Sequence, residues 1–413
     1  MTTDHTFVIV GASLAGAKAA EALRQEGFEG RLVLLGEEPE RPYERPPLSK
    51  DYLRGEAGPA KVYVHDEDFY AGQEIELRTS ARVVAVEPAA GQVLLESGER
   101  LGYDRLLLAT GAVAHHLPVP GADLPGVHTL RTLADSESLK QAMTRASRVA
   151  VVGAGWIGSE VAASARQMGT EVVLVVRGNV PLERVLGAEV GAVYHELHTD
   201  QGVELLPRTR VEAFAGTRSV EEIRTSDGRR IACDLVVVGV GAAPRIELAQ
   251  AAGLMVDGGI AVDERLETSA PGVFAAGDVA AAWHPFYQTR IRVEHWANAL
   301  HQGPAAARNM LGLDVSYERL PYFFSDQYDL GMEYTGYAPI WDKVVFRGNP
   351  DTREFIAFWL HDGRVLAGLN ANVWGVTGPI GELIRSRRQV DASELADPDV
   401  ALEDLAGIPQ TRS

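Results

Sequence analysis

Two glycine-rich segments of this sequence have the spacing of dinucleotide-binding turns. The first, Gly11-Ala12-Ser13-Leu14-Ala15-Gly16, follows the apolar run 7–10, and the second, Gly153-Ala154-Gly155-Trp156-Ile157-Gly158, follows the apolar run 149–152. Where a strand turns into a helix, glycine lets the backbone approach a pyrophosphate, and the helix N-terminus binds its negative charge. A third segment, Phe274-Ala275-Ala276-Gly277-Asp278, lies downstream. Together the three segments predict a protein that holds two dinucleotides and moves a hydride from nicotinamide to flavin.

Charged residues near the first turn are candidates for holding the first dinucleotide. Glu37 follows the expected second strand, 31–35, at the position where a carboxylate binds the ribose hydroxyls of adenosine. The alternative is a solvated loop carboxylate, since Glu38 and Glu40 lie beside it. The proline-rich segment 41–50 follows, which we expect to be a rigid loop without a helix that carries Arg45 and Lys50 beside a phosphate site.

The second turn has cations where a carboxylate is usual in NADH-selective enzymes. The expected strand 171–176 ends in Val176, and Arg177 and Arg184 follow on the same loop. An arginine in this place binds the 2′-phosphate of NADPH. The alternative is that Arg177 is a solvated loop cation.

Composition limits the class of protein. The chain has 413 residues, of which 46% are apolar, so it has room for two or three globular domains. Its formal net charge of −18 argues against binding to nucleic acid or to an anionic membrane. We find no signal peptide and no apolar run long enough to span a bilayer, which predicts a cytoplasmic protein.

The chain has one cysteine, Cys233, in the expected buried strand 231–238. An internal disulfide, a redox dithiol and a thiolate-bound iron–sulfur cluster are therefore excluded. Reduced flavin must then deliver its electrons directly, and a one-electron iron–sulfur carrier, if used, must be a separate protein. We expect no metal site.

The order of the expected elements predicts an α/β fold with two Rossmann-like, three-layer ββα domains. The NAD(P) domain, 113–244, is inserted in the FAD domain, which comprises 1–112 and 245–320. From residue 321 to 413 the pattern changes to alternating aromatic strands, which predicts an α+β C-terminal domain. We expect one acidic helix near its end, over 391–405.

Nearly the whole chain resembles the FAD-dependent ferredoxin reductases that serve bacterial oxygenases and cytochromes P450, which share the glutathione-reductase fold. The stretches that carry the resemblance are 8–23, 41–50, 106–111, 151–160, 273–278, 294–303 and 321–336. The resemblance implies FAD as cofactor and NAD(P)H as co-substrate, with NADH the usual choice of the family.

The resemblance also assigns residues to the two cofactors. The expected FAD-binding residues are Gly11, Ser13, Leu14, Ala15, Gly16, Glu37, Arg45, Lys50, Val83, Ala109, Thr110, Gly111, Arg131, Gly277, Asp278, Glu294, His295 and Trp296. The expected NAD(P)-binding residues are Gly153, Gly155, Trp156, Ile157, Gly158, Glu160, Val176, Arg177, Arg184, Val240 and Gly241.

Two positions depart from the family pattern. Ser13 replaces the second glycine of the first turn, which requires an ordinary φ or a wider loop at this residue. Phe324 stands where relatives often carry tryptophan, which argues against routing electrons through this ring.

Lys50 and Glu160 are the expected catalytic residues. Glu160 lies two residues past its glycine turn, and Lys50 ends the proline-rich segment. We predict that they pair near flavin N5, where Lys50 would stabilise negative charge. The alternative is an ordinary ion pair between two domains.

The predicted partner is an acidic [2Fe–2S] ferredoxin or rubredoxin that feeds a cytochrome P450 or oxygenase. Because this chain is itself acidic, docking requires a local cationic patch, for which the candidates are Arg290, Arg292, Arg385, Arg387 and Arg388. Arg385 to Arg388 are alternatively the cationic end of a helix. Other functions considered are an NAD(P)H oxidase or quinone-type reductase, and a redox-gated binding flavoprotein like apoptosis-inducing factor.

Overall fold

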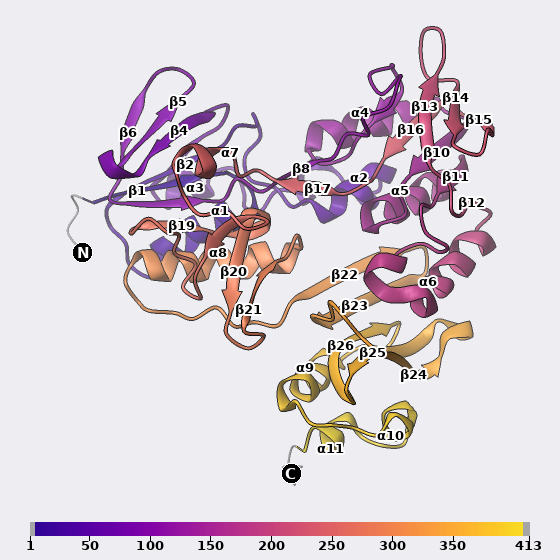
Figure 1. Cartoon of the computed structure of the whole chain (residues 1–413). Helices are drawn as coiled ribbons and strands as arrows, with labels where there is room; N and C mark the ends of the chain where they lie inside the picture. Colours follow the sequence, from indigo (N-terminus) through magenta and orange to yellow (C-terminus); the bar gives the residue numbers. More distant parts are fainter. Residues whose placement is uncertain (1–4, 408–413) are drawn as a thin grey trace. The chain divides into compact units, whose positions relative to one another are not determined.

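The computed structural model describes residues 5–407, and its contacts divide the chain into two compact units. The first unit contains the chain up to Pro46, Gly58–Val113 and Ala242–Arg319. The second contains Pro47–Ala57, Ala114–Gly241 and the chain from Leu320 onward. Figure 1 labels most of the helices and strands of both units.

A parallel sheet of five strands is the core of the first unit, in the order β19–β7–β1–β2–β3. Its strands are β1 (Thr6–Val10), β2 (Arg31–Leu35), β3 (Ile75–Arg78), β7 (Arg105–Leu108) and β19 (Val273–Ala275). Val8 lies opposite Val33 on one side and Leu106 on the other. The strands are almost wholly apolar because helices and loops bury both faces of a parallel sheet.

Two long helices of the first unit, α1 (Leu14–Gln25) and α8 (Trp296–Met310), pack closely on each other. A Cβ atom on Gly303 of α8 would lie 2.3 Å from the carbonyl oxygen of Ala15, so only glycine permits this approach. The remaining elements of the unit are α3 (Phe69–Gly72), β4 (Val83–Glu87), β5 (Gln92–Leu95), β6 (Arg100–Gly102), β8 (Ala112–Ala114), β17 (Ala242–Pro244), α7 (Glu247–Ala251), β18 (Ile260–Val262), β20 (Ala280–His284) and β21 (Thr289–Arg292).

The second unit contains a similar parallel sheet in the order β12–β11–β10–β16–β9. Its strands are β9 (Val127–His128), β10 (Arg148–Val152), β11 (Glu171–Val175), β12 (Glu204–Leu206) and β16 (Leu235–Val238). Around it are α4 (Leu133–Met143), α5 (Trp156–Gln167), α6 (Glu183–Asp200), which is kinked at Gly187, and the antiparallel strands β13 (Val211–Ala215), β14 (Glu222–Thr225) and β15 (Arg230–Ala232). Cys233 thus lies just after β15 rather than inside a continuous strand.

An antiparallel sheet in the order β22–β23–β26–β25–β24 completes the second unit. Its strands are β22 (Tyr322–Gln327), β23 (Leu330–Gly336), β24 (Lys343–Asn349), β25 (Glu354–His361) and β26 (Arg364–Ala371). Trp359 is fully buried, and its indole N–H donates to the carbonyl oxygen of Leu186 in α6 at 3.1 Å. The predicted fold class, two Rossmann-like domains with an α+β C-terminal domain, is confirmed.

Two local expectations were wrong. The acidic tail forms two short helices, α10 (Ala392–Ala396) and α11 (Leu402–Ala406), after α9 (Thr377–Ser386). Pro398 separates them, because proline has no N–H to donate and forces the preceding residue into extended backbone. The proline-rich segment also contains helical structure, a 3₁₀ turn (Pro46–Ser49) followed by α2 (Asp51–Arg54), because the fixed φ of proline suits the first turn of a helix.

Residues 47–57 are held on the second unit by hydrogen bonds from two helices. The hydroxyl of Ser136 in α4 donates to the carbonyl oxygen of Leu48 at 2.9 Å. The hydroxyl of Ser164 in α5 donates to the carbonyl oxygen of Ser49 at 2.6 Å. Lys50 therefore belongs to the same compact unit as Glu160.

Candidate active site

The expected FAD-binding residues of the first unit gather at one edge of its sheet. The parallel strands β1, β2, β7 and β19 all end there. The residues that follow these strands are Gly11, Glu37, Ala109 to Gly111, and Gly277. Ligands of open α/β sheets bind at the carboxyl ends of the strands, so the topology brings these positions to one site.

The first glycine turn has the close contacts that the motif requires. Gly11 has a φ of +117°, and a Cβ atom on it would lie 2.1 Å from the carbonyl oxygen of Ala109. A Cβ atom on Gly16 would lie 2.0 Å from the carbonyl oxygen of Gly11. Ser13, the N-cap of α1, has an ordinary φ of −117° and makes no side-chain cap bond. The serine therefore fits the turn, and the first N–H groups of α1 remain available for a phosphate.

Ion pairs fix two of the expected charged residues of the first unit. The Glu37 carboxylate lies 2.7 Å from Nη2 of Arg245 and is 45% exposed. Nη2 of Arg45 lies 3.1 Å from Oε1 of Glu38. Both side chains keep their position after β2, but each already has a partner of opposite charge.

The third signature is fixed by a glutamine that the sequence reasoning missed. The N–H of Gly277, whose φ is +79°, donates to Oε1 of Gln302 at 2.9 Å. Gln302 lies on α8, one residue before the close contact at Gly303, and is buried. The α1–α8 packing thus determines where the Gly277 turn lies.

The start of α8 presents a neutral histidine. His295 is the N-cap of the helix, and burial lowers its pKa to about 4, with the Asp278 carboxylate opposing this shift. A neutral imidazole adds no positive charge to this region, which the family resemblance predicts to lie along the flavin ring. Glu294 pairs with Arg292, Trp296 begins α8, and Val83 begins β4.

The second glycine turn repeats this geometry in the second unit. A Cβ atom on Gly153 would lie 2.4 Å from the carbonyl oxygen of Gly239, and one on Gly158 would lie 1.8 Å from that of Gly153. The middle glycine, Gly155, faces open space at the N-terminus of α5. Trp156 and Ile157 follow in the first turn of α5, and Val240 and Gly241 follow β16 at the same edge.

The loop after β11, where the sequence predicts the adenosine end of NAD(P)H, carries cations without partners in the described part of the chain. Among residues 5–407, the side chains of Arg177 and Arg184 are exposed and make no hydrogen bond or ion pair. Arg208, which the sequence reasoning missed, has the same properties and follows β12. Its N–H donates to the carbonyl oxygen of Gly178 at 2.8 Å, which holds it beside the loop of Arg177.

The nearest carboxylate on this loop is engaged within the loop itself. Glu183 accepts hydrogen bonds from the backbone N–H of Asn179 at 2.7 Å and from its side-chain amide at 2.8 Å. These bonds lower the pKa of Glu183 below its usual value. The loop is thus ordered by its own carboxylate, and its arginines remain available for an external anion.

Lys50 and Glu160 form a buried ion pair. Nζ of Lys50 lies 2.9 Å from Oε1 of Glu160, and the side chains are 13% and 5% exposed. The hydroxyl of Ser49 donates to Oε2 at 2.5 Å, and that of Ser325 donates to Oε1 at 2.7 Å. The carboxylate therefore has three donors, which is what a buried charge requires. The sequence reasoning found the pair but neither serine.

Other groups around this pair are aromatic or acidic. The ammonium of Lys50 lies 5.7 Å from the ring centroid of Phe324, a cation–π distance. Burial, together with Glu160, raises the pKa of Asp326 above its usual value. Arg131, whose N–H donates to Asp135, is also in this unit. The expected FAD residues thus divide, with Lys50 and Arg131 in the second unit and the others in the first.

Cys233 has the properties of a structural thiol. It is 4% exposed, and burial raises its pKa to about 12, so almost no thiolate exists near neutral pH. We expect Cys233→Ser to bind FAD normally and to reduce ferricyanide with NAD(P)H at the rate of the unchanged enzyme. Loss of this activity in a variant that keeps its flavin would contradict a mechanism without a thiol.

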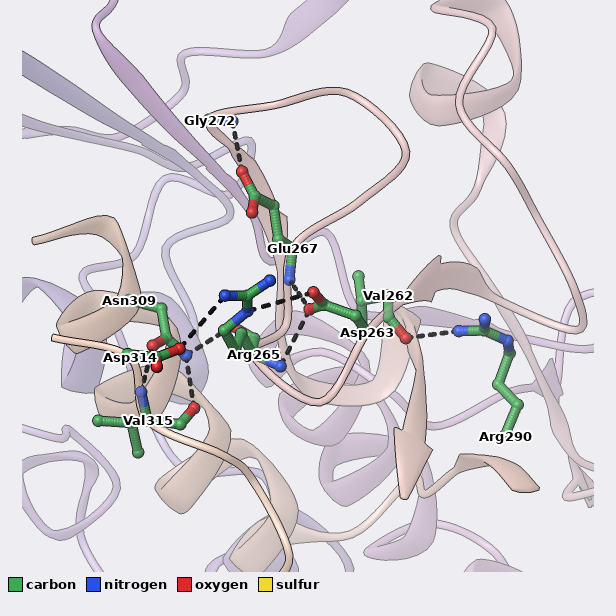
Figure 2. A network of polar contacts seen from close by, with 9 residues as sticks. All are labelled: Val262, Asp263, Arg265, Glu267, Gly272, Arg290, Asn309, Asp314 and Val315. Carbon is green, nitrogen blue, oxygen red and sulfur yellow. Dashed lines mark hydrogen bonds and ion pairs between the residues drawn. The ribbon is translucent and has the colours of Figure 1, made fainter. Parts of the chain in front are cut away.

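The predicted docking arginines differ in their surroundings. Figure 2 shows the guanidinium of Arg290 directed at the carbonyl oxygen of Val262. A second bond goes to the carbonyl oxygen of Ala281 at 2.9 Å, so Arg290 ties β18, β20 and β21 together. Arg292 donates to the carbonyl oxygen of Asp278 at 3.2 Å. The side chains of these two arginines thus stabilise the first unit by donating hydrogen bonds to its backbone.

The other three candidates lie at the end of α9 in the second unit. Arg385 is in the last turn of the helix, and Arg387 is its C-cap with a φ of 52°. Arg388 follows, and all three are exposed. Cations at this place are stabilised by the negative end of the helix dipole, which is the alternative role considered for them. Their exposure also leaves them accessible to a partner.

Comparison with known proteins places this geometry in a class of enzymes with two dinucleotide sites. Residues 5–303 match the pyridine nucleotide-disulphide oxidoreductase family, and residues 322–406 match the reductase C-terminal domain. The chain therefore belongs to the pyridine nucleotide-disulphide oxidoreductase family. The predicted cofactors, FAD and NAD(P)H, agree with this membership.

The relatives are ferredoxin reductases. The chain is 40% identical over 402 residues to the ferredoxin–NAD(+) reductase component of an anthranilate 1,2-dioxygenase system from Burkholderia cepacia, covering 96% of this chain and 98% of the relative. It is 36% identical to putidaredoxin reductase from Pseudomonas putida, covering 98% and 97%. The structure of the covalent putidaredoxin reductase–putidaredoxin complex matches with a TM-score of 0.94 at 36% identity, covering 100% of both chains. The predicted family resemblance is confirmed.

Two further observations concern sites of other kinds. Within residues 5–407, no group of three or more histidine, cysteine, aspartate or glutamate side chains is arranged to hold a metal ion. No helix in the described part of the chain is both long and apolar enough to cross a membrane.

Proposed function

We propose that this protein passes electrons from NAD(P)H through FAD to a separate [2Fe–2S] ferredoxin that serves a cytochrome P450 or oxygenase. The balanced reaction consumes one NAD(P)H and two oxidised ferredoxins and yields NAD(P)⁺, one proton and two reduced ferredoxins. The proposal rests on one combination of features: two parallel sheets that each carry a glycine-rich turn, and a single cysteine that is buried and protonated. Such a chain has no thiol that can relay electrons, and its relatives are reductases of ferredoxins.

The residues present fit FAD. A Cβ atom on Gly11 or Gly16 would clash with backbone, as in the tight turns that bind a pyrophosphate, and Gly277, with a φ of +79°, lies at the same edge of the sheet. When bound, FAD supplies a centre that accepts a hydride and releases single electrons. Gly11 to Gly16 would hold its phosphates, and Glu37 would hold the hydroxyls of its adenosine ribose. Lys50, held by Glu160, would supply a positive charge that stabilises negative charge on the reduced flavin.

We also propose that the enzyme accepts NADPH. Val176 provides no carboxylate to bind the ribose hydroxyls of NADH, and the edge beside it carries Arg177, Arg184 and Arg208 without partners among the described residues. An exposed, unpaired guanidinium is suited to bidentate binding of a phosphate.

The test of the function is a turnover assay with both nicotinamides. Reduction of cytochrome c is measured with and without candidate [2Fe–2S] ferredoxins at constant ionic strength. We expect rapid turnover only when a ferredoxin is present. Rapid consumption of oxygen or quinone without ferredoxin would instead assign an oxidase or quinone reductase.

We propose that the ferredoxin docks on Arg385, Arg387 and Arg388, which are exposed at the end of α9, and Arg385 and Arg388 are the clearest to test. Arg290 and Arg292 instead bond backbone carbonyl oxygens within the first unit. Arg385→Glu/Arg388→Glu is expected to slow reduction of an acidic ferredoxin about tenfold at low salt and to weaken its salt dependence. Ferricyanide reduction, which needs no docking, should be unchanged.

The matched control is Arg218→Glu/Lys343→Glu, which also reverses two exposed cations of the second unit, one after β13 and one at the start of β24. It should leave ferredoxin reduction nearly unchanged. Equal slowing in the control and in Arg385→Glu/Arg388→Glu would indicate an effect of net charge and would refute this docking site.

A further inference from the structure

Ser325 of the C-terminal sheet domain contacts the ion pair that we place at the flavin. Its hydroxyl donates to Oε1 of Glu160 at 2.7 Å, the same oxygen that lies 2.9 Å from Nζ of Lys50. Ser325 is 1% exposed and Glu160 is 5% exposed, so water does not replace this bond. The pair thus depends on a side chain supplied from 165 residues further along the chain.

The register of β22 is what brings Ser325 to Glu160. Alternate residues of a strand face the same side, and Phe323, Ser325 and Gln327 are the buried residues of β22. The Phe323 ring lies 4.8 Å from that of Trp156 at the start of α5, and Oε1 of Gln327 lies 3.1 Å from Nε2 of His198 in α6. A slip of one residue would place Phe324 or Asp326 at Glu160, so contacts on both sides of Ser325 select this register.

The two hydroxyls determine where the carboxylate of Glu160 points. Ser49 donates to Oε2, while Ser325 and Lys50 share Oε1, so the plane of the carboxylate is fixed by groups on both of its oxygens. A carboxylate that loses a donor draws more strongly on the donors that remain. Without Ser325, Glu160 would hold the Lys50 ammonium more tightly. The ammonium would then stabilise other nearby anionic groups less.

We propose that Ser325 is a positioning residue, which acts through Glu160 to determine where Lys50 holds its positive charge. The inference rests on the proposed role of Lys50 and Glu160 in hydride transfer. It makes the C-terminal domain a contributor to the redox site as well as a docking domain.

A neighbouring serine provides a matched control. Ser159 precedes Glu160 on α5 and is fully buried, and its hydroxyl has no hydrogen-bond partner among residues 5–407. Ser159→Ala therefore also removes one buried hydroxyl near the Glu160 carboxylate, but this hydroxyl is not a hydrogen-bond donor to it. Any effect of Ser325→Ala that exceeds that of Ser159→Ala reports the bond to Glu160.

The experiment compares the full-length, FAD-loaded enzyme with both alanine variants. Hydride transfer is measured by anaerobic stopped flow, and the flavin midpoint potential by redox titration. We expect Ser325→Ala to slow hydride transfer about tenfold with little change in KM, as removal of one hydrogen bond to a charged group does, and to make the potential more negative. Ser159→Ala should change neither quantity, and Ser325→Thr, which keeps the hydroxyl, should restore both.

A double-mutant cycle with Glu160→Gln tests whether Ser325 acts through Glu160. If it does, Ser325→Ala has little further effect on the potential once Glu160 is neutral. Equal rates and potentials in Ser325→Ala and Ser159→Ala would overturn the inference while Lys50→Met remains slow. If Lys50→Met itself keeps the normal rate and potential, the proposed role of the pair fails and the role of Ser325 fails with it.

Discussion

Lys50→Met is expected to transfer hydride about 100-fold more slowly than the unchanged enzyme while still binding FAD. Removing one preorganised group that stabilises developing charge typically costs two to three orders of magnitude. The measurement is the anaerobic reduction of the bound flavin by saturating NAD(P)H in a stopped-flow instrument. The flavin midpoint potential should become more negative in the same variant.

This substitution also leaves a buried carboxylate without its counter-ion. Because Glu160 is 5% exposed, Lys50→Met should lower the free energy of unfolding by about 3 kcal/mol. The control is Lys50→Met/Glu160→Gln, which removes both charges and should recover most of that stability without recovering the rate. A double variant that regains the normal rate would leave the pair only a structural role.

Arg177→Ala and Arg208→Ala are each expected to raise the KM for NADPH about 10- to 100-fold and to leave that for NADH nearly unchanged. Each removes one charge-assisted hydrogen bond to the 2′-phosphate, which contributes about 1.5–3 kcal/mol. The equilibrium measurement is calorimetric binding of adenosine 2′,5′-bisphosphate and of AMP. Only the bisphosphate should lose affinity.

Arg210→Ala is the matched control for these variants. Arg210 is exposed, lies two residues beyond Arg208, and has no side-chain hydrogen bond or ion pair in the described chain. Its removal should not change the KM for either nicotinamide. If the unchanged enzyme binds the bisphosphate no better than AMP, the proposed use of NADPH is wrong. If the unchanged enzyme binds the bisphosphate better than AMP, but Arg208→Ala has the same KM for NADPH as Arg210→Ala, only the proposed role of Arg208 is wrong.

The sequence predicted the two strand–turn–helix units well because their signals are local. In each turn, a strand, three closely spaced positions and the start of a helix are adjacent in the chain. A Cβ atom on Gly11 or Gly153 would clash with a backbone carbonyl oxygen, so only glycine fits at these positions. Ser13 departs from the motif but keeps an ordinary φ, so the middle position tolerates a side chain. Glu160 was found from its place two residues past the second turn, and Lys50 from its place at the end of the proline-rich segment.

The residues missed by the sequence reasoning are those whose role depends on long-range packing. Gln302 reaches Gly277 only because α8 packs on α1, and Ser325 reaches Glu160 only because β22 has one register against α5 and α6. Arg208 lies beside Gly178 because β12 pairs with β11. Serine, glutamine and arginine are common on any surface, so their types alone carried no signal. The prediction of a single helix in the tail was wrong for the opposite reason. Pro398 is a local signal for a break in the helix, but the prediction followed the acidic pattern alone.

The ion pair of Lys50 and Glu160 has a consequence for how the protein is made. Glu160 is bonded to residues that lie 111 positions before it and 165 positions after it in the chain. Contacts of this separation form late, because the loops that they close are costly in entropy. During synthesis, the carboxylate of Glu160 lacks one of its donors until Ser325 has left the ribosome. Given the proposed role of the pair, flavin loaded onto a growing chain would meet an incomplete site, and only the completed chain would reach its final flavin potential.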